Sequence, residues 1–191
     1  MNIKLRYTLV ISLLALVMFT SGCEQKAPQD ATVDNKTNTA KTETKTKTNN
    51  NDQTENIVVY FPNEDATALI PEIRSVKNGT NDVLIASIND LLTGTKKNGS
   101  VNIIPKGTKL YGLEVKNKIA YVNFSKELVK NFNGGSTGEI FLVGSIVNTL
   151  TEFPEVTSVV FMVEGKPVDT IAGHMDLTEP VKRMDNIINK K

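Results

Sequence analysis

Cysteine, histidine and tryptophan are almost absent from this chain. Its 191 residues include one cysteine, one histidine and no tryptophan. A single cysteine excludes an intramolecular disulfide and any cysteine-rich zinc site. A single histidine leaves little scope for histidine-based metal binding or acid–base catalysis. Neither sign of charge prevails, because 22 Lys and Arg stand against 21 Asp and Glu, which argues against a nucleic-acid-binding surface. We therefore expect no metal, no cofactor and no nucleic-acid partner.

The chain also lacks a hydrophobic run long enough to span a membrane. Its longest apolar segment, residues 8–19, has twelve residues, whereas a transmembrane helix needs about 20. Two basic residues precede this segment, and Thr-Ser-Gly-Cys follows it at 20–23. Small residues before a lone cysteine resemble a bacterial lipobox. Residues 1–23 are therefore interpreted as a lipoprotein signal peptide, with Cys23 as the lipidation site. The alternative is an ordinary secretory signal that happens to contain a cysteine.

Lipid on Cys23 predicts a mature chain held on the extracytoplasmic face of the bacterial cell membrane. Fatty acyl chains such as palmitate anchor durably, since each buried CH₂ group contributes about 0.8 kcal/mol. Residues 24–55 follow, rich in Thr, Asn and Lys, with Val33 as their only large aliphatic side chain. Such a segment buries too little apolar surface to offset the entropy of ordering, so we expect a disordered tether. Fully extended, it reaches on the order of 100 Å.

The composition changes sharply after the tether, and residues 56–178 predict a single folded domain. Runs of β-branched and aromatic residues indicate strands, and apolar residues three and four apart indicate helices. The expected strands are 57–61, 69–76, 110–115, 119–124, 159–163 and 168–172, and the expected helices are 82–92, 125–131 and 136–152. This order predicts an α+β fold, a two-layer sandwich with two main helices packed on one face of a largely antiparallel sheet. Residues 179–191 are assigned to a C-terminal tail.

Glycine and small polar residues at 134–138 precede the longest expected helix. Ser136 and Glu139 have the spacing of a capping box, in which each side chain accepts the main-chain N–H of the other. The buried stripe of the helix is expected to consist of Ile140, Val143, Val147 and Leu150. The glycines could instead cradle an anion, but the lysine and preceding strand of a phosphate-binding loop are missing.

Five stretches of the domain have a distinctive order and spacing. These stretches are residues 83–94, 104–110, 120–125, 146–156 and 163–165. The second begins with Ile-Pro-Lys-Gly-Thr, the third is Ala-Tyr-Val-Asn-Phe-Ser, the fourth contains Thr-Leu-Thr-Glu-Phe-Pro, and the fifth is Val-Glu-Gly. Together they resemble the GerMN domain, a sporulation and spore-germination module of bacterial surface lipoproteins. The resemblance implies an extracytoplasmic, non-enzymatic domain and supplies no catalytic residues. The sequence differs from the family pattern at the expected hairpin turn, where Asn117-Lys118 replaces the more usual Asp-Gly type of pair.

Few residues could support catalysis. His174 is the only imidazole, with Asp169 and Asp176 near it in sequence, but the Gly-x-Ser-x-Gly motif of a serine hydrolase is absent. Glu152 and Glu155 could form the carboxylate pair of a glycoside hydrolase, although acidic residues are ordinary at such a helix end. We therefore predict no enzymatic activity and no catalytic residues.

These features favour a lipid-anchored interaction or scaffolding module of the cell envelope, linked by its family resemblance to sporulation or germination. Its expected partners are envelope proteins or peptidoglycan, and the domain is expected to be monomeric in isolation. Peptidoglycan binding through the wall glycan and a weak envelope hydrolase are the alternatives. The strand at 69–76 is expected at a sheet edge, because Pro71 lacks an N–H. That edge is a candidate surface for adding a partner's strand.

Overall fold

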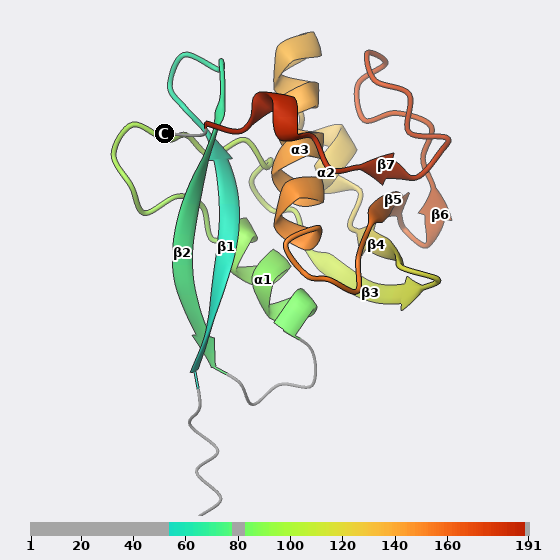
Figure 1. Ribbon diagram of the computed structural model, residues 1–191. Coiled ribbons are helices and arrows are strands. Elements are labelled where there is room, and N and C mark those ends of the chain that lie inside the picture. Colours follow the sequence, from blue (N-terminus) through green and yellow to red (C-terminus); the bar gives the residue numbers. More distant parts are fainter. Residues whose placement is uncertain (1–53, 78–82, 190–191) are drawn as a thin grey trace, which may run out of the picture. The chain divides into compact units, whose positions relative to one another are not determined.

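The computed structural model describes residues 54–77 and 83–189 (Figure 1). The predicted signal peptide, Cys23 and the tether up to residue 53 lie outside the described residues. The strands are β1 (Thr54–Pro62), β2 (Leu69–Lys77), β3 (Leu110–Lys116), β4 (Ile119–Phe124), β5 (Ser158–Val163), β6 (Lys166–Pro167) and β7 (Val181–Lys182). The helices are α1 (Val83–Leu92), α2 (Glu127–Lys130), α3 (Gly135–Leu150) and the 3₁₀ turn η1 (Asp185–Ile187). Within the described ranges, no helix is both long and apolar enough to cross a membrane.

The strands form two sheets. β1 and β2 pair antiparallel along their whole length, from Thr54 opposite Lys77 to Pro62 opposite Leu69. The second sheet has the order β3-β4-β5-β6, and β7 also pairs with β5. β4 and β5 run parallel, because the connection that carries α2 and α3 is long enough for a crossover. The predicted α+β class is confirmed, but the strands form two sheets instead of one, and one pair is parallel.

Helix α3 packs against strands of both sheets and is buried on almost every side (Figure 1). Val143, Val147 and Leu150 of the predicted stripe are fully buried, whereas Ile140 is 38% exposed. A helix covered on two sides needs apolar residues around most of its circumference. The prediction of one buried face was therefore too narrow, and it was wrong for Ile140.

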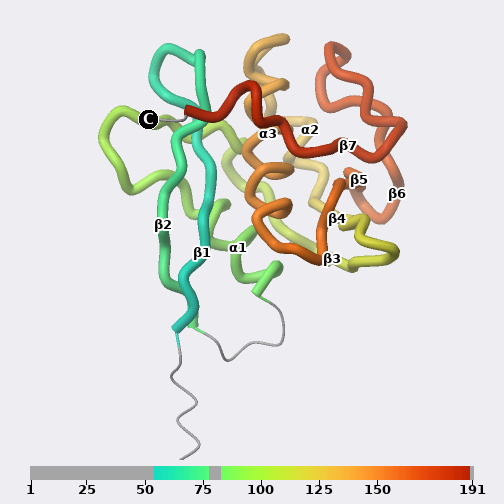
Figure 2. Tube along the Cα trace, viewed as in Figure 1, coloured from blue at the N-terminus to red at the C-terminus, as the bar shows by residue number. Residues whose placement is uncertain are grey.

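The C-terminal segment belongs to the folded domain. Figure 2 shows it crossing α3 toward the start of β2. Asn148 of α3 binds it with both ends of its amide, since Oδ1 accepts the Met184 N–H at 2.8 Å and Nδ2 donates to the Met184 carbonyl at 3.2 Å. The Asn189 N–H then donates to the carbonyl of Leu69 at 2.8 Å. Residues 181–189 thus form a short strand and a 3₁₀ turn packed on the domain, where the sequence predicted a tail.

Two further expectations concern turns and strands. The hairpin of β3 and β4 is confirmed, and both turn residues are left-handed, with φ of 52° at Asn117 and 64° at Lys118. These angles match the turn type that suits the twist of a two-residue hairpin. The predicted strand at 168–172 is wrong, because in this part of the chain the pairing with β5 ends at β6 and the Val168 N–H. The chain then forms a loop that is held from α3.

Candidate functional site

Glu139 does not form the predicted capping box. The structure places Gly134 at the N-cap of α3, with no side-chain hydrogen bond there. Glu139 is fully buried, and its carboxylate accepts four hydrogen bonds from the loop after β6. The donors are the Thr170 hydroxyl at 2.7 Å and the N–H groups of Ile171, Ala172 and His174 at 2.8 to 2.9 Å. Gly134 before α3 and Gly138 in its first turns accommodate the ring of Phe132, which lies within 3.3 Å of any Cβ added at either glycine.

These hydrogen bonds keep Glu139 ionised. Burial works to raise the pKa of its carboxyl group, but the bonds from Thr170 and three N–H groups outweigh it, and the pKa lies below its ordinary value of 4.5. A carboxylate with this environment is a poor proton donor at neutral pH. Its arrangement indicates a structural role, which is to fix the loop at 170–174 against α3.

His174, the imidazole that lies near Asp169 and Asp176 in sequence, belongs to the loop that the Glu139 carboxylate holds. His174 contributes its main-chain N–H to Glu139, and its side chain is exposed. Asp169 and Asp176 are also exposed, and the carboxylate of Asp176 accepts hydrogen bonds from Thr178. No group of three His, Cys, Asp or Glu side chains in the part of the chain that the structure describes is placed to hold a metal ion.

The sequence offers Glu152 and Glu155 as a possible carboxylate pair of a glycoside hydrolase. In the structure, Glu152 instead belongs to a hydrogen-bonded network at the surface. Its Oε1 accepts from the Tyr60 hydroxyl and from Arg183, each at 2.6 Å. Burial and the hydrogen bond to Glu152 raise the pKa of Tyr60 above its ordinary value of 10.0. Arg183 also pairs with Asp185 at 2.9 Å, so this network ties the C-terminal segment to β1 and α3.

A second charged network is buried, and no sequence motif indicated it. Arg74 of β2 lies 2.7 Å from Glu72 and 2.7 Å from Asp90 of α1, and it donates to the Gly94 carbonyl at 2.8 Å. Burial works to raise the pKa of Glu72, but hydrogen bonds from the Thr95 hydroxyl and from Arg74 hold it below the ordinary value. The network fixes the C-terminal end of α1 and residues 94–96 against β2. Removing one partner of such a buried pair typically costs about 3–5 kcal/mol.

The chain after this network forms the wall of a groove. The Thr95 N–H donates to Asn102 Oδ1 at 2.6 Å, which connects the buried network to residues 102–106. We call the hollow along these residues the 102–106 groove. It consists of two pockets that share this segment as a wall.

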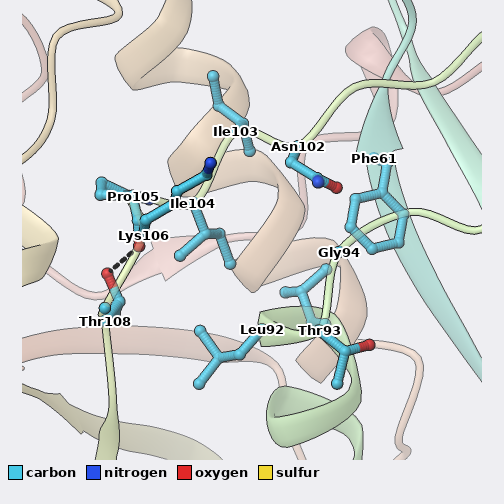
Figure 3. A pocket seen from close by; sticks show the side chains of 12 residues that line it. Phe61, Leu92, Thr93, Gly94, Asn102, Ile103, Ile104, Pro105, Lys106 and Thr108 are labelled. Atoms are coloured by element: carbon cyan, nitrogen blue, oxygen red, sulfur yellow. Dashed lines mark hydrogen bonds between the residues drawn. The ribbon is translucent and has the colours of Figure 1, made fainter.

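The first pocket, of about 290 Å³, lies between residues 102–108 and the end of α1 (Figure 3). Phe61, Leu91, Leu92, Ile103 and Ile104 supply its apolar side chains. The second pocket, of about 500 Å³, lies between residues 102–106 and the loop 131–134 that precedes α3. Phe132 adds an aromatic ring there. The Ile-Pro-Lys-Gly-Thr stretch that carries part of the family resemblance thus lines the groove.

The edge of β2 is partly covered. β2 pairs with β1 alone along its length, as the position of Pro71 predicted. Leu69, however, is bridged by Ile188, and the Pro71 carbonyl accepts from Lys97 Nζ at 2.9 Å. Further along the strand, Ile73 is 74% exposed.

Comparison with known proteins gives one family. A family model described as Germane, sporulation and spore germination, matches residues 58–169. The spore germination protein GerM of Bacillus subtilis (strain 168) is 29% identical over 141 residues, which cover 70% of this chain and 38% of that protein. The chain therefore spans well under half the length of this relative.

Two solved structures share the fold. Tandem GerMN domains of the sporulation protein GerM from Bacillus subtilis match with a TM-score of 0.59 and 27% identity, over 77% of this chain and 51% of theirs. The first GerMN domain of that protein matches with a TM-score of 0.56 and 19% identity, over 69% of this chain and 99% of its own. The described domain thus corresponds to one unit of the tandem pair, and the predicted GerMN resemblance is confirmed. The chain belongs to the Germane family of sporulation and spore germination domains.

Proposed function

We propose that this protein is a lipid-anchored binding module on the extracytoplasmic face of the cell membrane, which acts in sporulation or spore germination without catalysis. The observation that carries the proposal is the 102–106 groove. Its lining by described residues is apolar and amide-rich, with Lys106 as the charged side chain among them. Such a lining suits recognition of a ligand, whereas proton transfer requires a positioned acid or base.

The proposed location rests on the sequence before the domain. Cys23 follows a short apolar segment and small residues, which is the order that lipoprotein processing requires. The predicted tether would let the domain reach on the order of 100 Å from the membrane. Membership of a sporulation and germination family supports the proposed cellular stage.

The proposal is tested by replacing the gene in the bacterium that encodes it. Deletion should lower the count of heat-resistant spores or slow their germination, and the wild-type gene should restore both. The Cys23→Ser gene should fail to restore them, because the protein loses its anchor. A matched Ser21→Ala gene keeps a small residue before Cys23 and should complement fully.

Two results would contradict the proposal. A deletion strain with normal sporulation and germination would exclude a role at this stage. Full complementation by Cys23→Ser would show that anchoring is not needed.

A further inference from the structure

The wall shared by the two pockets has an unpaired main chain. The N–H and C=O groups of Asn102, Ile103 and Ile104 make no hydrogen bond with any other described residue. The neighbours on either side are fixed, since the Val101 N–H donates to Pro62 at 2.8 Å and Asn131 donates to the Lys106 carbonyl at 3.1 Å. Main-chain groups of this kind need a partner, which is either water or a ligand.

The side chains of Ile103 and Ile104 are half-buried and pack against the core clusters. Residues 102–104 are thus held in place by the hydrogen bonds of their neighbours at both ends and by the packing of their apolar side chains. Residues 102–104 belong to no strand, but because they are held, their free main-chain groups are available for the main-chain hydrogen bonds of an extended peptide.

The groove also carries one uncompensated charge. Lys106 is exposed, and among the described residues it is the only charged one that lines either pocket. It belongs to none of the ion pairs among the described residues. A cation beside apolar pockets is complementary to a ligand that combines apolar groups with a carboxylate.

The unpaired main chain of the wall favours a peptide over a glycan. Asn102 Oδ1 already accepts the Thr95 N–H, and Asn131 Nδ2 already donates to the chain. The other end of each of these amides has no partner among the described residues, and neither has Asn133 of the second pocket, so the side chains alone would also suit sugar hydroxyls. The run of unpaired main-chain groups at 102–104 is what favours a peptide, because a peptide pairs with main-chain groups and fills pockets with its side chains.

We propose that the 102–106 groove binds an extended peptide segment of a partner protein. Its main chain pairs with residues 102–104, two of its apolar side chains enter the two pockets, and a carboxylate beside them meets Lys106. This inference rests on the proposed function, because it names the class of partner for the same groove.

The test uses an array of hexapeptides in which leucine, threonine and aspartate are permuted over the six positions. The full chain, solubilised in detergent, is applied, and affinities of selected peptides are measured by fluorescence anisotropy. Peptides with two leucines close to an aspartate should bind best. Replacing aspartate by asparagine should weaken binding about tenfold, since a charge-assisted contact is lost. N-methylation of the central peptide bonds should weaken it as well.

Lys106→Glu supplies the decisive variant. It should reverse the charge preference, so that hexapeptides with lysine in place of aspartate bind more tightly than the originals. Lys109→Glu is the matched control, because Lys109 is exposed and lines neither pocket. Its preference should remain that of the wild type, and both variants should melt at the wild-type temperature.

Three results would overturn the inference. The first is absence of binding by every hexapeptide at millimolar concentration while the protein is folded. The second is the same preference for aspartate in Lys106→Glu and Lys109→Glu. The third is binding of the peptide-free wall disaccharide of N-acetylglucosamine and N-acetylmuramic acid, with the hexapeptides failing to compete. Any of these, found together with a spore defect in the deletion strain, would remove the peptide assignment and leave the proposed function standing.

Discussion

A buried carboxylate that accepts four hydrogen bonds stabilises the fold most while it is charged. Glu139 is fully buried, and its pKa is lowered in the folded protein. Its contribution is therefore complete above its ordinary pKa of 4.5 and is lost as the pH falls through the lower folded value.

Glu139→Gln should lower the free energy of unfolding at pH 7 by about 1–3 kcal/mol, because the charge and one acceptor oxygen are lost. The variant should also lose less stability than the wild type between about pH 5 and pH 3, since one linked group is gone. Part of the acid sensitivity should remain, because the pKa of Glu72 is lowered too. Urea unfolding followed by circular dichroism at several pH values measures both effects.

The matched control for this measurement is Glu155→Gln. Glu155 is exposed and forms no hydrogen bond or ion pair with a described residue. It should unfold like the wild type at every pH. Equal midpoints for Glu139→Gln and the wild type at pH 7 would contradict the structural role assigned to Glu139.

The role of Glu139 could not be predicted from its neighbours in sequence. Its four donors lie 31 to 35 residues further along the chain. The capping box, in contrast, pairs two residues that are about three positions apart in sequence. The capping-box pattern was therefore easier to recognise in the sequence than the true partners of Glu139, and the prediction made from it was wrong. The one available hint was that Glu139 is the only charged residue of α3 (Gly135–Leu150), because a buried charge requires partners.

At the scale of elements, the local patterns predicted α1, β5 and the β3–β4 hairpin well. Each depends on periodicity or turn chemistry within about ten residues. The failures all required a distant partner. The loop at 168–172 departs from a strand because α3 holds it, and the C-terminal segment is ordered by Asn148 and Leu69.

The edge strand β2 gives a prediction at this scale. Ile73→Lys should change the free energy of unfolding by less than about 0.5 kcal/mol, because Ile73 is 74% exposed. Leu69→Lys should prevent folding, because Leu69 is fully buried against Tyr60 and Phe141. Thermal unfolding of the two variants compares them directly. A strongly destabilised Ile73→Lys would mean that this edge is covered in the folded protein.

At the scale of the whole molecule, the sequence indicates one segment of the groove but not the groove itself. The stretch 104–108 was visible as a motif, and Lys106 within it. Its place between the end of α1 and the loop 131–134 depends on the buried Glu72–Arg74–Asp90 network and on Thr95 bound to Asn102. No local pattern connects those residues, so the pocket could not be predicted.

The proposed role depends on where this domain is located in the cell. A groove that binds an envelope partner is useful only if the chain is exported and retained at the membrane, and both are proposed to depend on Cys23.

Metabolic labelling with an alkyne analogue of palmitate tests this most directly. The wild-type protein should carry the label after coupling to a fluorophore. Cys23→Ser should be unlabelled and should run as the uncleaved precursor, because its hydroxyl cannot replace the thiol that receives the lipid. Equal labelling of the two proteins, or an unlabelled wild type, would contradict the account.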